Sequence, residues 1–134
     1  MSRPKPIEYA DAPPQVREVF DDIKRSRKVE DVNNFWKYLA HDPVLLRRTW
    51  ESVKEVMAPG TLNPLVKELL YVAVSVTNGC DYCIASHTAS ARKSGMTPAM
   101  FHELMSVVGM ANETNRLVKG YQVEIDDAFK SPSL

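Results

Sequence analysis

The sequence has few cysteines, no excess of either charge and no long apolar run, and each of these shortages excludes a class of protein. Two cysteines in 134 residues do not make the disulfide framework of a small secreted domain. Lys plus Arg and Asp plus Glu number 17 each, whereas a nucleic-acid-binding protein usually carries a basic excess. The longest apolar run, LLYVAVSV at 69–76, is too short to span a membrane.

The first fourteen residues also lack the apolar segment of an export signal. We therefore expect a cytoplasmic protein that contacts neither nucleic acid nor membrane. A hydrophobic fraction of 44% over this length is enough to bury one core without disulfide or metal staples. The sequence thus predicts a single domain over 1–134, with loose ends at 1–12 and 127–134.

Proline positions predict where helices begin. Asp, Asn or Thr precedes a proline and an apolar-periodic run at three places, Pro43, Pro64 and Pro98, which is the pattern of an N-cap followed by proline at the first helical position. Apolar periodicity predicts further helices over 12–26 and 32–40, and a separate short helix over 113–121. No hairpin signal or repeat interrupts this pattern, so the predicted fold class is all-α.

The helix expected from Pro64 is apolar nearly all round, because only three residues between 65 and 76 are hydrophilic in type. Such a helix is predicted to be buried. Asn78-Gly79 should end it, with Gly79 as a left-handed cap. The next helix should begin with Cys80 and stop at Gly95.

The stretch NGCDYCIASH at 78–87 holds both cysteines and one of the three histidines. Free N–H groups and the positive end of the helix dipole favour a thiolate in the first turn, where Cys80 and Cys83 are expected. His87 follows Cys83 by four residues, so both project from one face and the imidazole can act as a base or as a thiolate partner. The two cysteines are also close enough to form a disulfide.

Glu68 lies in the predicted buried helix, where a carboxyl group must find a partner. If the two central helices pack as a hairpin, Glu68 can meet His87, directly or through a water, and make a Glu–His–Cys relay. Tyr82, between the cysteines, and Ser86 are candidates to line the same site.

Three interpretations of the cysteine pair stay open at this point: a redox thiol pair, a zinc site and inert core cysteines. Zinc would be held by Cys80, Cys83 and His87, with Glu68 as a fourth ligand. Structural zinc sites usually draw ligands from two separated knuckles, and a chain of this size does not need zinc to fold. The redox interpretation is favoured, and no cofactor is expected.

The pattern Glu68-x11-Cys80-x2-Cys83-x3-His87 resembles the active-site pattern of the AhpD-like alkylhydroperoxidases, within the carboxymuconolactone decarboxylase superfamily. The flanking segments at 34–50 and 57–87 are similar to the peroxidase-related branch. The resemblance covers about residues 15–125, with the core of the domain at about 62–120.

The resemblance implies an all-α fold with the C-x-x-C at the start of a central helix, assembled as a homo-oligomer, a trimer or a hexamer. It implies a thiol-dependent peroxidase in which Cys83 attacks the hydroperoxide, Cys80 resolves it, and Glu68 and His87 relay protons. The physiological dithiol or protein reductant is not implied. Well-studied members carry a second histidine where this chain has Tyr82. The alternative is a non-catalytic member of the superfamily that senses oxidation or binds zinc.

Overall fold

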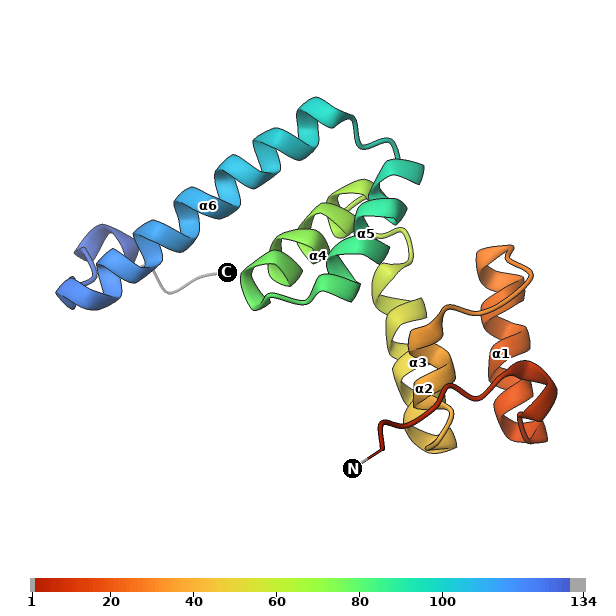
Figure 1. The fold of residues 1–134 in the computed structure, drawn as a ribbon. Coiled ribbons are helices and arrows are strands. Elements are labelled where there is room, and N and C mark those ends of the chain that lie inside the picture. Colours follow the sequence, from red (N-terminus) through yellow and green to blue (C-terminus); the bar gives the residue numbers. More distant parts are fainter. Residues whose placement is uncertain (1, 131–134) are drawn as a thin grey trace. The chain divides into compact units, whose positions relative to one another are not determined.

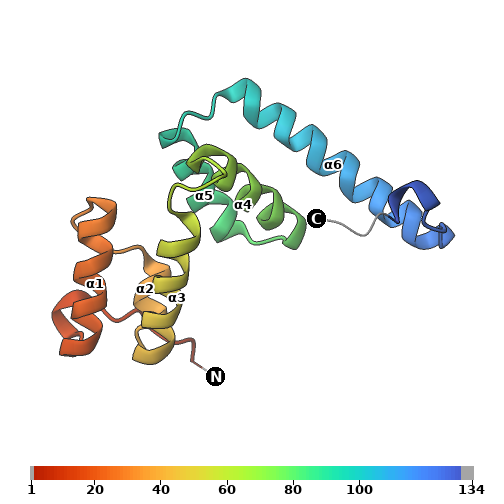
Figure 2. The same cartoon turned by 180° about the vertical axis from the view of Figure 1, so that it is seen from behind.

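The computed structural model describes residues 2–130, and over this range the chain is helical and contains no β-strand (Figures 1 and 2). The all-α prediction is therefore confirmed. The elements in chain order are the 3-10 turn η1 (Tyr9–Asp11), α1 (Pro14–Arg27), α2 (Asn34–Leu39), α3 (Pro43–Met57), α4 (Pro64–Asn78), α5 (Asp81–Lys93), α6 (Pro98–Tyr121) and the 3-10 turn η2 (Asp127–Phe129).

The helix starts predicted from proline are confirmed. Each of the three prolines is the first residue of its helix, and the residue before it accepts hydrogen bonds from backbone N–H groups of the following turn at 2.9 to 3.2 Å. The capping residues are Asp42, Asn63 and Thr97. These caps satisfy donors that the first turn of a helix leaves without a partner.

The chain forms two compact units, divided between Ala58 and Pro59. The assignment of residues 1–134 to one domain stays a prediction. In the first unit the apolar stripe of α1 lies inward, as its periodicity predicts, and packs with residues of α2 and α3. The side chains of Trp36 and Trp50 meet edge to face in this core, with ring centroids 5.5 Å apart. The unit thus has a hydrophobic core of its own.

The N-terminal segment, expected to be loose, makes specific contacts from Lys5 onward. The backbone oxygen of Lys5 lies 2.6 Å from His41 Nε2. The buried ammonium group of Lys37 lies 2.7 Å from both Glu8 and Asp31. The pKa of Lys37 is raised mainly by its hydrogen bond to Asp31 and, to a smaller extent, by its hydrogen bond to Glu8. These contacts attach the segment to α2.

The second unit contains a hairpin of α4 and α5, which lie side by side in both views (Figures 1 and 2). Gly79 joins them with φ of 70°, the left-handed conformation predicted from the sequence. Gly95 ends the second helix of the hairpin region, also with positive φ. Asn112 of α6 donates a hydrogen bond to Thr77 Oγ1 at 3.0 Å, which ties α6 to the end of α4.

The prediction of a separate helix over 113–121 is wrong, because α6 continues without a break from Pro98 to Tyr121. Asn112 is a frequent capping residue type, but its side chain instead donates to the oxygen of Val108 at 2.8 Å, one turn back in the same helix. The side chain thus stays within one helix and does not cap a new one.

The prediction that α4 is buried is also wrong for the single chain. Only Val72 and Ser75 of this helix are buried, whereas Leu70 is 52% and Val74 59% exposed. The physical reason is that α5 and α6 are too few to cover an apolar helix on all sides. Over residues 2–130, no helix is both long and apolar enough to cross a membrane.

Candidate functional site

The two cysteines lie at the start of α5, where Cys80 is the residue before the helix and Cys83 is in its first turn. Gly79 ends α4, and Cys80 then donates its backbone N–H to the oxygen of Ser75 at 3.0 Å. Cys80 is the N-cap of α5, and its sulfur accepts the N–H of Cys83 at 3.3 Å. The left-handed glycine therefore turns the chain so that both sulfurs lie at the positive end of the α5 dipole.

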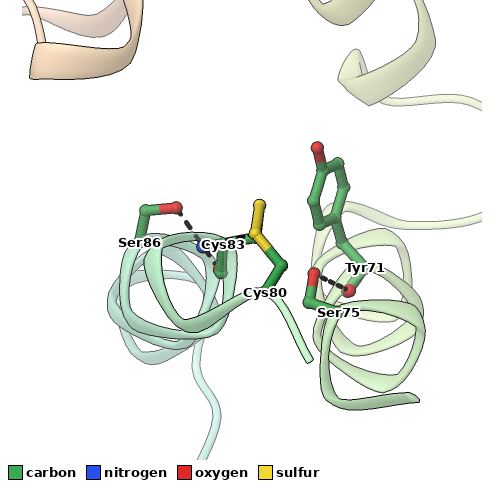
Figure 3. The surroundings of a disulfide bond; sticks show 5 residues. All are labelled: Tyr71, Ser75, Cys80, Cys83 and Ser86. Atoms are coloured by element: carbon green, nitrogen blue, oxygen red, sulfur yellow. Dashed lines mark hydrogen bonds between the residues drawn. A yellow bond between two sulfur atoms is a disulfide. The ribbon is translucent and has the colours of Figure 1, made fainter. Parts of the chain in front are cut away.

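Cys80 and Cys83 are joined by a disulfide (Figure 3). Their Cα atoms are 5.3 Å apart, within the ordinary range for a bridged pair. Both residues are partly exposed. The C-x-x-C pair thus has a backbone geometry that lets one cysteine bond to the other without unfolding the helix.

Glu68 of α4 and His87 of α5 meet directly across the hairpin. Glu68 Oε2 lies 2.7 Å from His87 Nδ1, and the two side chains are only 15% and 16% exposed. If Glu68 is ionised, its carboxylate can only accept, and Nδ1 is then the donor of this hydrogen bond. Nε2 is then left as the ring nitrogen that can accept a proton.

Tyr71 is a site residue that the sequence reasoning missed. Its ring stacks on the imidazole of His87, with centroids 3.4 Å apart and planes inclined by 16°. Figure 3 shows the ring on the same side of the two helices as the sulfur atoms. Tyr71 lies three residues after Glu68, so helical spacing on α4 could have placed both on one face.

Of the two candidates to line the site, Ser86 contacts a cysteine directly, because its hydroxyl donates to the backbone oxygen of Cys83 at 3.3 Å. Tyr82 is 46% exposed on α5. The aromatic ring that stacks on His87 is that of Tyr71, from α4.

The zinc interpretation has no support in the part of the chain from 2 to 130, where no group of three or more His, Cys, Asp or Glu side chains is arranged to hold a metal ion. The sulfurs of Cys80 and Cys83 are bonded to each other, and Nδ1 of His87 is occupied by Glu68. This arrangement suits thiol–disulfide chemistry assisted by an acid–base pair.

Comparison with known proteins agrees with this geometry. A crystal structure of the alkylhydroperoxidase AhpD core from Rhodospirillum rubrum is 47% identical to the chain, with a TM-score of 0.93 over 98% of this chain and 99% of that one. An uncharacterized protein from Cupriavidus necator is 34% identical over 55 residues, which are 41% of this chain and 49% of that protein. The chain thus spans about half the length of this curated relative.

Residues 43–123 match the carboxymuconolactone decarboxylase family. The match covers more than half of the chain and includes the whole α4–α5 hairpin together with the Cys80–Cys83 pair. The fold likeness to the AhpD core extends over nearly all of the chain. The chain belongs to the carboxymuconolactone decarboxylase family, as an AhpD-like member.

Proposed function

We propose that the protein is a thiol-dependent peroxidase that reduces hydroperoxides through the Cys80–Cys83 pair. The observation that carries this proposal is the position of a disulfide-forming pair at the start of α5, on the helix whose His87 is hydrogen-bonded to a carboxylate. The likeness to a protein described as an alkylhydroperoxidase core supports it.

The first step is attack by the Cys83 thiolate on one oxygen of the hydroperoxide. An S–O bond forms, the O–O bond breaks, and the leaving alkoxide takes a proton and departs as an alcohol. Cys83 is thereby oxidised by two electrons to a sulfenic acid. The sulfur of Cys80 then attacks that of Cys83, the S–S bond forms, and the hydroxyl group leaves as water with the Cys80 proton.

Glu68 and His87 supply the proton transfers of this sequence. His87 Nε2 accepts the proton of the Cys83 thiol and returns it to the alkoxide, while Glu68 stabilises the imidazolium formed in between. The hydrogen bond of 2.7 Å between the two side chains supports this role. We also assign Ser86 to the lining of the site, and its hydroxyl donates to the backbone oxygen of Cys83.

The cycle closes when a dithiol, either small or carried by a protein, reduces the disulfide by exchange and is itself oxidised to a disulfide. The net reaction converts one hydroperoxide and one dithiol to an alcohol, water and a disulfide. We place this cycle in the cytoplasm, where reducing systems keep dithiols available.

We also propose that the protein acts as a homo-oligomer, a trimer or a hexamer. The exposed apolar side chains of α4 and α6 support this, because single soluble chains rarely leave a large contiguous apolar surface in water. A second copy of the chain would cover these helices.

The alternative function is redox sensing without turnover. The observation that favours it is Tyr82, since well-studied relatives have a histidine at this place and a tyrosine is a weak base near neutral pH. A sensor forms the disulfide once per oxidation event, whereas a peroxidase consumes many equivalents of peroxide when dithiol is present.

The test is steady-state consumption of tert-butyl hydroperoxide with excess dithiothreitol. We expect many turnovers for the wild type, none above background for Cys83→Ser, and a strong decrease for His87→Gln. Cys80→Ser lacks the resolving thiol, so dithiothreitol must reduce its Cys83 sulfenic acid directly, and we expect turnover to fall well below that of the wild type. Disulfide formation without turnover under any dithiol would overturn the peroxidase proposal in favour of the sensor.

A further inference from the structure

The ring of Tyr71 covers one face of the His87 imidazole. The two centroids are 3.4 Å apart and the planes differ by 16°, while Glu68 Oε2 holds Nδ1 at the ring edge. Two residues of α4 thus constrain one side chain of α5 in different ways. Glu68 contacts the ring at one nitrogen, and Tyr71 covers the face of the ring.

We propose that Tyr71 is a positioning residue for the reaction, which keeps His87 in the single orientation that proton transfer needs. This inference rests on the proposed peroxidase function. The torsion that turns an imidazole about its Cβ–Cγ bond is broad and has no sharp preference of its own. One hydrogen bond to Glu68 restrains the ring at one atom only, so the aromatic contact supplies the remaining restraint.

The register of α4 supports this role. Glu68, Tyr71 and Ser75 follow one another at helical spacing on one face of the helix. Ser75 accepts the backbone N–H of Cys80 at 3.0 Å and donates its own hydroxyl to the oxygen of Tyr71 at 2.7 Å. The same face of α4 therefore holds both the imidazole and the first turn that carries the cysteines.

The contact uses the face of the Tyr71 ring, and the residue is 36% exposed. A phenyl ring should therefore replace the phenol without loss, whereas a leucine, which is apolar but has no ring, cannot stack. This distinguishes positioning by the ring from catalysis by the hydroxyl group. It also tests positioning against simple burial, because leucine still places apolar atoms beside the imidazole.

The experiment compares Tyr71→Phe and Tyr71→Leu with the wild type in steady-state reduction of tert-butyl hydroperoxide by dithiothreitol. We expect Tyr71→Phe to keep kcat within about twofold and Tyr71→Leu to lower it about tenfold, which is near the upper end of what an aromatic pair contributes. KM for the peroxide should stay unchanged, because Tyr71 acts through His87. The matched control is Tyr38→Leu, an exposed tyrosine of the first unit, which should behave as wild type.

A second measurement does not depend on turnover. Nitrogen-15 NMR of the imidazole side chains reports which nitrogen of His87 carries the proton. We expect one dominant Nδ1–H form in wild type and Tyr71→Phe. In Tyr71→Leu we expect a mixture of forms, because a ring that turns out of its plane loses the hydrogen bond between Nδ1 and Glu68. Equal spectra and equal kcat for Tyr71→Leu and wild type would overturn the positioning role. Loss of activity in Tyr71→Phe would overturn it too, in favour of a hydroxyl role. If the wild type shows no turnover, only the peroxidase proposal is refuted. The NMR spectra then still decide whether Tyr71 positions the His87 ring.

Discussion

Glu68 and His87 have lost most of their solvent exposure and hold each other through one hydrogen bond of 2.7 Å. At the scale of single residues, this pair is the proton relay that we propose for the cysteines of α5. A thiol needs help to give up its proton near neutral pH, and an imidazole whose charged form faces a carboxylate is suited to take it. The charge of Glu68, not only its size, is therefore the property to test.

Glu68→Gln keeps the shape and an acceptor oxygen but removes the charge. We expect the rate of Cys83 oxidation by peroxide to fall about 10²-fold, the lower end of what general acid–base assistance contributes, while the melting temperature changes little. Stopped-flow measurement of oxidation of the reduced protein provides the rate. Glu51→Gln, an exposed glutamate of α3, is the matched control. A Glu68→Gln rate equal to that of the control would remove Glu68 from the relay.

Asp22 gives a second prediction at the residue scale, in the first unit. It accepts hydrogen bonds from Lys54 at 2.9 Å and from Trp50 at 2.7 Å, and the bond from Lys54, followed by that from Trp50, lowers the pKa of Asp22 to about 2. A carboxyl whose pKa is lower in the folded chain stabilises the fold above pH ~4, and this contribution is lost as the pH falls through the folded-state pKa.

Asp22→Asn should therefore lower the free energy of unfolding by about 1 kcal/mol at pH 7, a value kept small because solvent screens a partly exposed group. At pH 2 the difference from wild type should nearly vanish. Urea unfolding at the two pH values measures both. If Asp22→Asn lowered the free energy of unfolding equally at pH 7 and at pH 2, the charge of Asp22 would play no part in stability.

At the scale of the elements, the turn between α4 and α5 determines where the sulfurs lie. Gly79 has φ of 70° and Gly109 lies within α6, and at neither position would an added Cβ meet another atom within 4 Å. The two glycines thus differ in backbone conformation but not in available space. This makes them a matched pair for testing whether the turn depends on left-handed backbone.

Gly79→Ala should lower the free energy of unfolding by about 1 kcal/mol, because a side chain disfavours left-handed backbone. Gly109→Ala should raise it by about 0.5–1 kcal/mol, because alanine favours helix over glycine. Thermal and urea unfolding measure both. A Gly79→Ala variant as stable as wild type would contradict the account of the turn.

The elements also show how much of the fold could be predicted from the sequence. Pro43, Pro64 and Pro98 predicted helix starts correctly because cap and proline signals are local. The Glu68–His87 contact was also predictable, since a hairpin of two helices leaves few arrangements. The exposure of α4 in the single chain could not be predicted. An apolar helix indicates that something covers it, but the sequence does not tell whether the same chain or a second copy does. Tyr71 was missed since its neighbours in sequence all look like core.

At the scale of the whole molecule, apolar side chains of α6 remain exposed together with those of α4. Val107 and Met110 lie three residues apart on α6, so they share a face of the helix. Exposed apolar faces of this kind are typical of surfaces that associate. The proposed homo-oligomer would bury them between copies of the chain.

The variant Val107→Glu with Met110→Glu should dissociate the assembly, because it places two like charges where apolar contact is needed. Light scattering after size-exclusion chromatography should give a trimer or hexamer for the wild type and a smaller species for the variant. Val44→Glu, an exposed apolar residue of α3, is the control and should keep the wild-type mass. A wild type that elutes as a monomer would contradict the proposed assembly.

The central claim is that Cys80 and Cys83 are a redox pair, and intact mass spectrometry tests it most directly. The protein is reduced, treated with a chelator, and exposed to one equivalent of tert-butyl hydroperoxide. The account predicts that the wild type loses two hydrogen atoms while Cys80→Ser gains one oxygen on Cys83. A wild-type mass unchanged by peroxide, or a mass that includes one zinc ion before chelation and resists oxidation, would contradict it.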